Sequence, residues 1–159
     1  MSVQLKLRVA KSGASSHYLP IPEAVAQQIL QEFGKRIVCV VKGRPPLHCA
    51  LLRSNAIGYY IMLGKKSRQQ LNITFGEELE LKIDQDRSQY QAKVPQELQV
   101  VLETDPQGLE QFERLSDGKK RSIIHYIDRA KQSDTRINRA LKLVERIKRG
   151  QTNSKDLFR

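Results

Sequence analysis

The sequence predicts an α+β protein, in which a small, internally duplicated β-barrel precedes a C-terminal helical segment. Residues 3–43 and 45–85 resemble each other without a gap, and apolar residues alternate in both copies as in half-buried strands. After residue 97 apolar residues recur every three or four positions, the spacing of amphipathic helices. The predicted parts are therefore a barrel domain over 1–97, a helical region over 98–150 and a flexible tail over 151–159.

The repeat is clearest where Tyr18-Leu19-Pro20-Ile21 returns as Tyr60-Ile61-Met62-Leu63, 42 residues later. Eight of the 41 aligned positions are identical, and apolar residues stay opposite apolar residues at strand spacing. Keeping both properties without a gap indicates a duplication. In the first copy the identical residues are Leu5, Ser12, Ala14, Tyr18, Gln27, Gln28, Phe33 and Gly34.

Each copy is predicted to run strand, strand, short helix, strand. In the first copy Pro22 suits the first turn of the helix, and Gly34 suits a left-handed cap at its end. In the second copy the helix is predicted over 65–72. Two such units can close a barrel with a helix at each end, and closure removes the exposed sheet edges that invite aggregation.

The second copy also carries a helix–glycine–strand pattern, from Gln69 through Phe75-Gly76 to Leu79. This pattern resembles the half-barrel of AbrB-like transcription factors, which usually complete their barrel by dimerising. The resemblance implies a double-split barrel with AbrB-like halves, both of them present in this one chain. We therefore expect a monomer, and a sedimentation mass near twice 18.2 kDa at micromolar concentration would contradict that expectation.

Composition indicates a soluble globular protein, with 39% hydrophobic and 28% charged residues among 159. No apolar run approaches the roughly 18 residues needed to cross a membrane. The first residues lead straight into an alternating strand, so we expect no signal peptide. Cys39 and Cys49 are then expected to be reduced, packed thiols in a cytoplasmic protein.

Three helices are predicted in the C-terminal region from their starting residues. Asp105 can cap a helix that has Pro106 at its first position, and Ser116 can cap the second. Ser133 or Asp134 can cap the third. The predicted buried side of this third helix consists of Ile137, Ala140, Leu141, Val144 and Ile147.

Positive charge is concentrated between residues 114 and 149, where twelve Lys or Arg face four Asp or Glu, a net of +8 out of +11 for the chain. Two interpretations stay open: a solvated face, or a surface that binds anions by releasing counterions. Tyr126 is the one aromatic residue there, so base stacking has little support. The predicted partners are nucleic acid or an acidic protein, without membrane insertion. The candidate contacts are Arg121, Lys131, Arg136 and Arg139.

The same stretch carries a family resemblance. An Ala130-Lys131 step, then Thr135-Arg136 and a further Arg139, resembles the C-terminal motif of the YdeI/OmpD-associated family. Tyr126 stands where that family often has Trp. The barrel resembles the domain of unknown function often fused to it, through Gly34-Lys35-Arg36, Tyr59-Tyr60, Phe75-Gly76 and Val94-Pro95. The resemblance implies a role in protection against bacteriocins and antimicrobial peptides, with a link to an outer-membrane porin.

Catalytic signatures are missing from the sequence. His17, His48 and His125 lie far apart and lack metal-ligand spacing with either cysteine. No glycine loop of the Walker or dinucleotide type is present, and no Ser-His-Asp arrangement has a recognisable context. We therefore predict no enzymatic activity, no cofactor and no metal.

Three hypotheses about function follow. The first is a non-enzymatic binding protein of the bacteriocin-protection or stress-associated type. The second is a nucleic-acid-binding protein that uses the four candidate cations. The third is a barrel that binds a small ligand or peptide in a cleft beside His17, Tyr59 and Tyr60.

Overall fold

In a computed structural model the chain forms two compact units, Met1–Arg87 and Ser88–Arg159. The structure describes residues 2–13 and 16–159, so Ala14, one of the eight repeated identities, lies outside the described residues. The division after residue 87 comes earlier than the predicted one after residue 97. The reason is that Tyr90, Ala92 and Val94 pack in the core of the helical unit.

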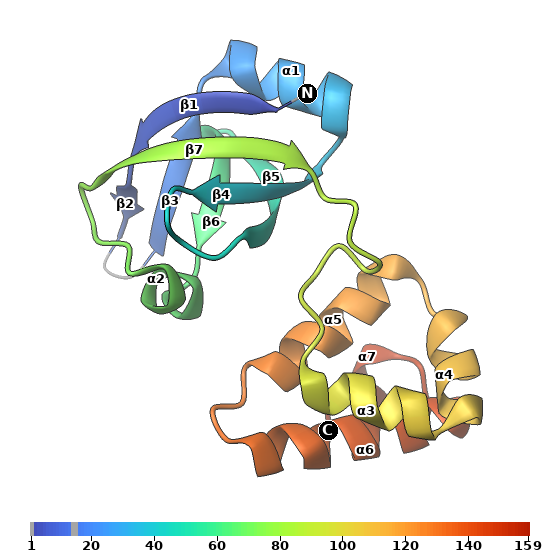
Figure 1. Cartoon of the computed structure of the whole chain (residues 1–159). Coiled ribbons are helices and arrows are strands. Elements are labelled where there is room, and N and C mark those ends of the chain that lie inside the picture. Colours follow the sequence, from blue (N-terminus) through green and yellow to red (C-terminus); the bar gives the residue numbers. More distant parts are fainter. Residues whose placement is uncertain (1, 14–15) are drawn as a thin grey trace. The chain divides into compact units, whose positions relative to one another are not determined.

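The first unit, here called the barrel unit, is a curled half-barrel of seven antiparallel strands in the order β1-β7-β4-β5-β6-β3-β2 (Figure 1). The outermost strands in this order, β1 and β2, are separated only by Val9, so the two ends of the curled sheet meet in one segment. The strands are β1 (Val3–Arg8), β2 (Ala10–Ser12), β3 (Ser16–Ile21), β4 (Arg36–Val41), β5 (Leu47–Ser54), β6 (Gly58–Leu63) and β7 (Glu78–Gln85).

Two short helices accompany the strands, α1 (Glu23–Phe33) and α2 (Lys65–Leu71), and they lie at opposite ends of the half-barrel (Figure 1). Helix α1 begins directly after Pro22 and ends at Gly34, whose φ of 77° is open to glycine. Its ψ of −162° is extended, so this cap departs from the predicted left-handed form. Helix α2 ends one residue before its predicted end, because Asn72 takes up the left-handed conformation.

The duplication is visible in the elements themselves. The strand β3, helix α1 and strand β4 begin at residues 16, 23 and 36, and their counterparts β6, α2 and β7 begin at 58, 65 and 78, each 42 residues later. Four of the six strand pairings join one copy to the other: β1 with β7, β4 with β7, β4 with β5, and β3 with β6. Each copy therefore completes the sheet of the other.

The interior of the half-barrel is filled by aliphatic side chains from both copies. Leu19 and Ile37 of the first copy and their counterparts Ile61 and Leu79 are at most 2% exposed. Ile29 of α1 and Leu71 of α2 bury against the same cluster. Burial of this apolar surface is the main stabilising contribution to the unit.

The second unit, here called the helical unit, consists of five helices around a separate core. Asp105 caps α4 by accepting from the Gly108 amide, and Ser116 caps α5 by accepting from the Lys119 amide, both as predicted. Gln132, rather than Ser133 or Asp134, takes the cap position of α6. The helices are α3 (Gln96–Thr104), α4 (Pro106–Glu113), α5 (Asp117–Asp128), α6 (Ser133–Lys148) and α7 (Ser154–Leu157).

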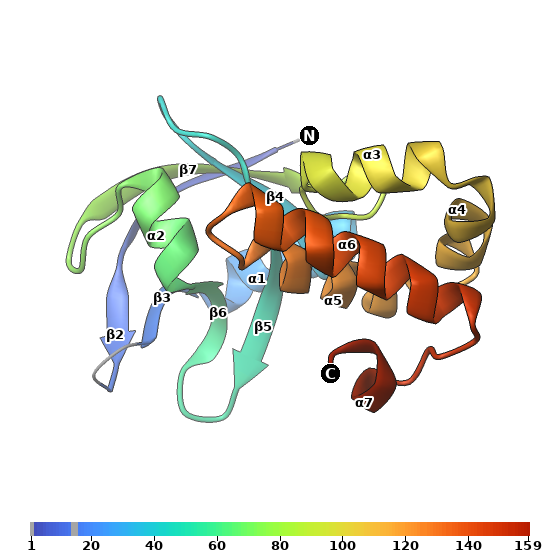
Figure 2. The same ribbon diagram turned by 90° about the horizontal axis from the view of Figure 1, so that it is seen from below.

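Two details of this unit differ from the sequence-based expectation. Leu143 is buried in α6, whereas Ile137 and Leu141 are 39% and 48% exposed, so the buried face is turned relative to the predicted one. Residues 154–157 form α7 instead of a flexible tail, and Leu157 is completely buried in the core. Figure 2 shows α7 folded back beside the second half of α6. Among the described residues, every helix is too short or too polar to cross a lipid bilayer.

Candidate functional site

The predicted anion contact Arg136 is bound within the fold. Its Nε donates to Glu97 Oε1 at 2.8 Å, and its Nη1 donates to the carbonyl oxygens of Ala130 and Lys131 at 2.9 and 3.0 Å. These bonds tie the turn between α5 and α6 to α3. This explains two dipeptides of the family motif in structural terms. The carbonyl oxygens of Ala130-Lys131 accept hydrogen bonds from the arginine of Thr135-Arg136.

The other three predicted contacts are placed differently from one another. Arg139 Nη1 donates to the Tyr126 carbonyl oxygen at 2.6 Å, and its guanidinium carbon lies 4.4 Å from the centre of the Tyr126 ring. Arg121 Nη1 donates to Gln91 Oε1 at 3.3 Å. Lys131 is exposed. The four residues therefore do not form one patch of unengaged cations.

A basic pocket lies between α5, α6 and α7, with a volume of about 250 Å³. Its cationic lining comes from Arg139, Lys142, Arg146 and Arg159, and no Asp or Glu lines it. Within residues 2–13 and 16–159, these cations form no ion pair with a carboxylate side chain. The remaining lining residues are Tyr126, Thr135, Asn138, Leu143 and Leu157.

Backbone oxygens fix the two arginines at the centre of this pocket. Arg146 Nη1 donates to the carbonyl oxygens of Leu157 and Arg159, at 2.7 and 3.0 Å, while Tyr126 holds Arg139. The Tyr126 ring also packs against Phe158, with the ring centres 5.1 Å apart. The guanidinium groups are therefore ordered before a ligand arrives, which lowers the entropic cost of binding.

The pocket follows from helical spacing. Thr135, Arg139, Lys142 and Arg146 recur at intervals of four, three and four, so they form one stripe along α6. This stripe was the sequence signal for the pocket. Lys142 and Arg146 were not among the candidate site residues predicted from the sequence. Helical spacing predicts the stripe, but it does not predict that α7 packs beside it.

Glu97 and Asp105 of the helical unit are paired with cations of α6 that lie outside the lining of the pocket. Glu97 accepts from its own amide, Ser133 and Arg136, and these hydrogen bonds lower the pKa of its carboxyl group. Lys148 and the Gly108 amide likewise lower the pKa of Asp105. These carboxylates are engaged in holding α3 and α4 to α6, so they are not available to neutralise the pocket.

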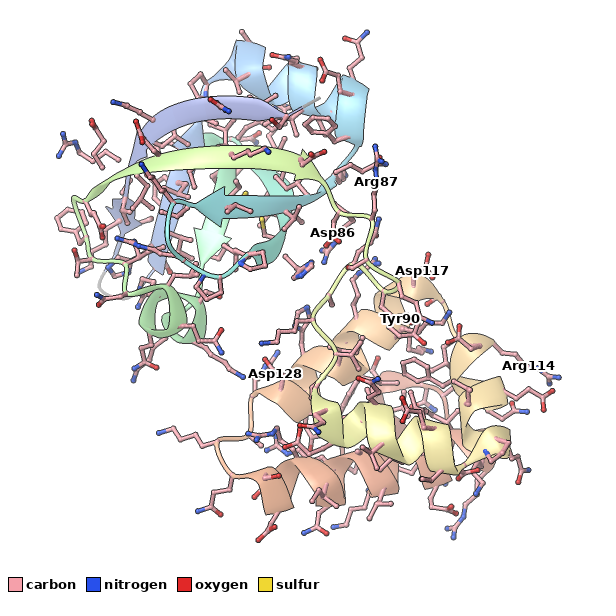
Figure 3. All side chains as sticks on the ribbon, viewed as in Figure 1. Asp86, Arg87, Tyr90, Arg114, Asp117 and Asp128 are labelled. Carbon is pink, nitrogen blue, oxygen red and sulfur yellow. The ribbon has the colours of Figure 1, made fainter. Side chains whose placement is uncertain are left out.

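A second cluster joins the start of the helical unit to α4 and α5. Tyr90 donates to the carboxylate of Glu113, and burial together with this hydrogen bond raises the pKa of the Tyr90 hydroxyl. The buried Lys120 reaches Glu113 Oε2 at 3.2 Å and lies 5.8 Å from the Tyr90 ring centre. Figure 3 labels Tyr90 and Asp117 on the same side of the unit. The cluster pairs its own charges, so we assign it a structural role.

A histidine–carboxylate pair lies in the barrel unit. His48 Nδ1 lies 2.7 Å from Asp86 Oδ2, and the Asp86 side chain is only 2% exposed. Figure 3 labels Asp86 where the chain leaves β7. The carboxylate of Asp86 can orient the imidazole ring of His48. The two residues are 38 positions apart in sequence, so no local sequence motif predicts the pair.

The predicted cleft beside His17, Tyr59 and Tyr60 is not assembled. Tyr59 and Tyr60 are consecutive in β6 and so point to opposite faces of the sheet. Tyr59 packs against the aliphatic interior, while Tyr60 meets Tyr18 edge-on at 5.9 Å between ring centres. His17 instead meets the Phe75 ring, 6.3 Å away. Tyr60 thus lies on the opposite face of β6 from Tyr59, so the three side chains do not line one cleft.

The two cysteines lie together on β4 and β5 as free thiols, with their Sγ atoms 3.6 Å apart. The hydrogen bond to Cys49, together with burial, raises the pKa of Cys39 well above its usual value, so that thiol stays protonated. Across the described ranges, no group of three or more His, Cys, Asp or Glu side chains is arranged to hold a metal ion.

Two family models match the chain. Residues 91–150 match the family described as bacteriocin-protection, YdeI or OmpD-associated, and residues 6–83 match a domain of unknown function, DUF1905. The protein is therefore a fusion of these two domains. Its helical unit carries the bacteriocin-protection family domain and its barrel unit carries DUF1905, which confirms the predicted arrangement. A search of curated proteins found no match to the chain.

Proposed function

We propose that this protein is a non-enzymatic binding protein of the bacteriocin-protection or stress-associated type, and that its helical unit binds an anionic partner. The family domain at 91–150 supports the biological setting. The absence of a catalytic motif in the sequence supports a binding role over catalysis. Turnover of a small substrate that depends on a single barrel residue would contradict this proposal.

The proposal of an anionic partner rests on the uneven distribution of charge along the helical unit. Residues 88–113 hold one Lys against five Asp or Glu, a net of −4, whereas residues 114–149 hold a net of +8. Four of these twelve cations, Arg114, Lys120, Arg136 and Lys148, form ion pairs within the unit. The other eight have no carboxylate partner among the described residues.

A direct role as a sink for cationic antimicrobial peptides does not fit this surface, because like charges repel. We therefore propose that protection, if it depends on this protein, proceeds through an acidic protein or another anion. We also propose a cytoplasmic monomer. In support, both copies of the repeat already pair within one chain, and Cys39 and Cys49 are free thiols with their Sγ atoms 3.6 Å apart.

Nucleic acid is the second candidate partner. The +8 charge of residues 114–149 favours it, because neutralising phosphates releases counterions. Arg136 is paired with Glu97, and Arg139 lies in a pocket of about 250 Å³, so Arg121 and Lys131 are the better candidates for contacts to the phosphates of a polymer.

The test is binding of the full chain to mixed-sequence duplex DNA and to polyglutamate across a salt series. Replacing Arg121 and Lys131 by Gln should reduce the salt slope for DNA, since each phosphate contact contributes about 0.9 to the slope. The matched control replaces the exposed Lys42 and Lys65 of the barrel unit, which removes the same charge. Binding of neither polyanion near physiological salt would overturn the proposal of a macromolecular anionic partner.

A further inference from the structure

The basic pocket differs from the rest of the charged surface because its cations line one shared, partly open volume. Arg139, Lys142, Arg146 and Arg159 line about 250 Å³, and no Asp or Glu is among the lining residues. Like charges held this close repel one another, and the repulsion is stronger at a partly buried site than in bulk water. An anion in the pocket would convert that repulsion into attraction.

The pocket offers several hydrogen-bond donors to such an anion. Arg139 and Arg146 each use Nη1 to bind backbone oxygens. A guanidinium group has five N–H donors, so each arginine keeps others for a ligand. The planar guanidinium fork suits the oxygens of a phosphate, and Lys142 adds a point charge. The polar groups of Asn138 and Thr135 complete a donor set along α6.

The size of the pocket limits the ligand. Since a water molecule occupies about 30 Å³ in the liquid, the volume holds roughly eight waters. Pockets for drug-sized ligands begin at about 300 Å³. Leu143, Leu157 and the Tyr126 ring add an apolar wall beside the donors. These dimensions fit one phosphate group on a small organic carrier, and they exclude a polymer from the interior of the pocket.

Resting on the anionic partner proposed above, we propose that the pocket between α5, α6 and α7 binds a small phosphomonoester. The phosphate group lies against Arg139, Lys142 and Arg146, and the carrier lies against Leu143 and Leu157. This assignment names a ligand class for the helical unit and makes α7 part of the binding site.

The experiment titrates the full chain with glucose 6-phosphate at constant ionic strength, with calorimetry for affinity and amide chemical shifts for location. We expect saturable binding, with shifts confined to Tyr126 and to residues 135–146 and 157–159. Glucose should not bind. Binding should weaken as the pH falls below about 6, where the phosphate loses its second negative charge.

Lys142 provides the decisive substitution, because it is exposed and lies at the pocket without an ion-pair partner among the described residues. Lys142→Gln should weaken binding about tenfold, the effect of losing one charge-assisted hydrogen bond. The matched control Lys65→Gln removes the same charge from an exposed position of the barrel unit, outside the pocket, and should leave the affinity within about twofold. Equal effects of the two substitutions would overturn the assignment of the site. Asn138→Ala gives an uncharged second check and should also weaken binding.

Comparison ligands test the ligand class. If inorganic phosphate binds as tightly as glucose 6-phosphate, the proposed contact between the pocket and the organic carrier is wrong. If succinate binds more tightly than glucose 6-phosphate, the pocket prefers a carboxylate and the assignment of a phosphate ligand is wrong. The outcome is separable from that of the macromolecular proposal. Polyanion binding that persists in the Lys142→Gln variant, together with no phosphomonoester binding, would overturn only the pocket assignment.

Discussion

The two units carry almost the same net charge but distribute it differently. The barrel unit has 13 Lys or Arg against 7 Asp or Glu, a net of +6, and the helical unit has 15 against 10, a net of +5. On the barrel, Lys6 and Arg8 of β1 stand directly opposite Glu80 and Glu78 of β7. On the helical unit, the cations of α6 form a stripe around a pocket without acids. The net charge of a unit therefore does not predict where an anion could bind, whereas the presence or absence of ion pairs around each cation does.

The units also differ in how they are held together. The barrel unit depends on strand pairing between the two copies of the repeat, so its apolar interior is assembled from segments distant in sequence. The helical unit has its own apolar core, and ion pairs between helices, such as Arg136 with Glu97 and Lys148 with Asp105, add to it. Different changes should therefore break each unit.

The largest expected effect is loss of the barrel fold when one copy of the repeat is removed. A chain of residues 1–43 should be unfolded, because among the described residues of the first copy only β2 and β3 pair with each other. Circular dichroism and amide signal dispersion measure this. Adding residues 44–87 should restore the sheet, whereas a folded monomer of residues 1–43 alone would contradict the interdependence of the copies.

An intermediate effect is expected from two glycines that are needed for different reasons. A Cβ added at Gly108 of α4 would lie 2.4 Å from Val144 Cγ1, so Gly108→Ala should cost about 1–3 kcal/mol by overpacking. A Cβ at Gly34 would meet nothing within 4 Å, but the φ of +77° should make Gly34→Ala cost about 1–2 kcal/mol.

Chemical denaturation of each variant, followed by signals from each unit, measures both costs. The two mechanisms separate when Val144→Ala is added, because trimming a neighbour relieves a clash but not backbone strain. The loss in the Gly108→Ala, Val144→Ala double variant should be smaller than the sum of the single losses. The loss from Gly34→Ala should stay additive with Val144→Ala. Additivity in both cases would contradict the steric explanation.

The smallest expected effect is a difference in acid sensitivity. Hydrogen bonds lower the pKa of Glu97, Asp105 and Glu113 in the helical unit, and of Glu77 in the barrel unit. A lowered pKa stabilises the fold above the unfolded values of about 3.9 for Asp and 4.3 for Glu. This contribution is lost as the pH falls through the lower folded values.

The helical unit should therefore lose more stability than the barrel unit below about pH 4. Amide signals from each unit during an acid titration measure the order of unfolding. Glu97→Gln should reduce the pH dependence of the helical unit without changing that of the barrel. Earlier acid unfolding of the barrel would contradict the prediction.

Much of the fold was predictable because its signals are local. The strand alternation, the caps at Asp105 and Ser116 and the break at Gly34 each depend on a few neighbouring residues. The repeat added the long-range information, since equivalent segments were expected to pair. The resemblance to AbrB-like half-barrels stays a prediction.

The misses came from packing between helices. The α6 face was expected to include Ile137 and Leu141, but α3, α4 and α7 cover the side that contains Leu143. The polar end of the chain gave little sign of α7, whose order depends on the burial of Leu157 and on the hydrogen bond from Arg146 to its carbonyl oxygen. Short polar helices form only where tertiary contacts offset their nucleation cost.

The sequence by itself determined the duplicated barrel, the helical region, the family and the excess of positive charge, because periodicity, repetition and composition are properties of the chain. Only the tertiary structure decided which cations form bonds that stabilise the fold and which of them line the pocket. Arg136 and Arg139 have the same charge and lie three residues apart, yet only Arg139 lines the pocket. The physical reason is that hydrogen-bond acceptors and neighbouring charges are set by chain segments brought together on folding.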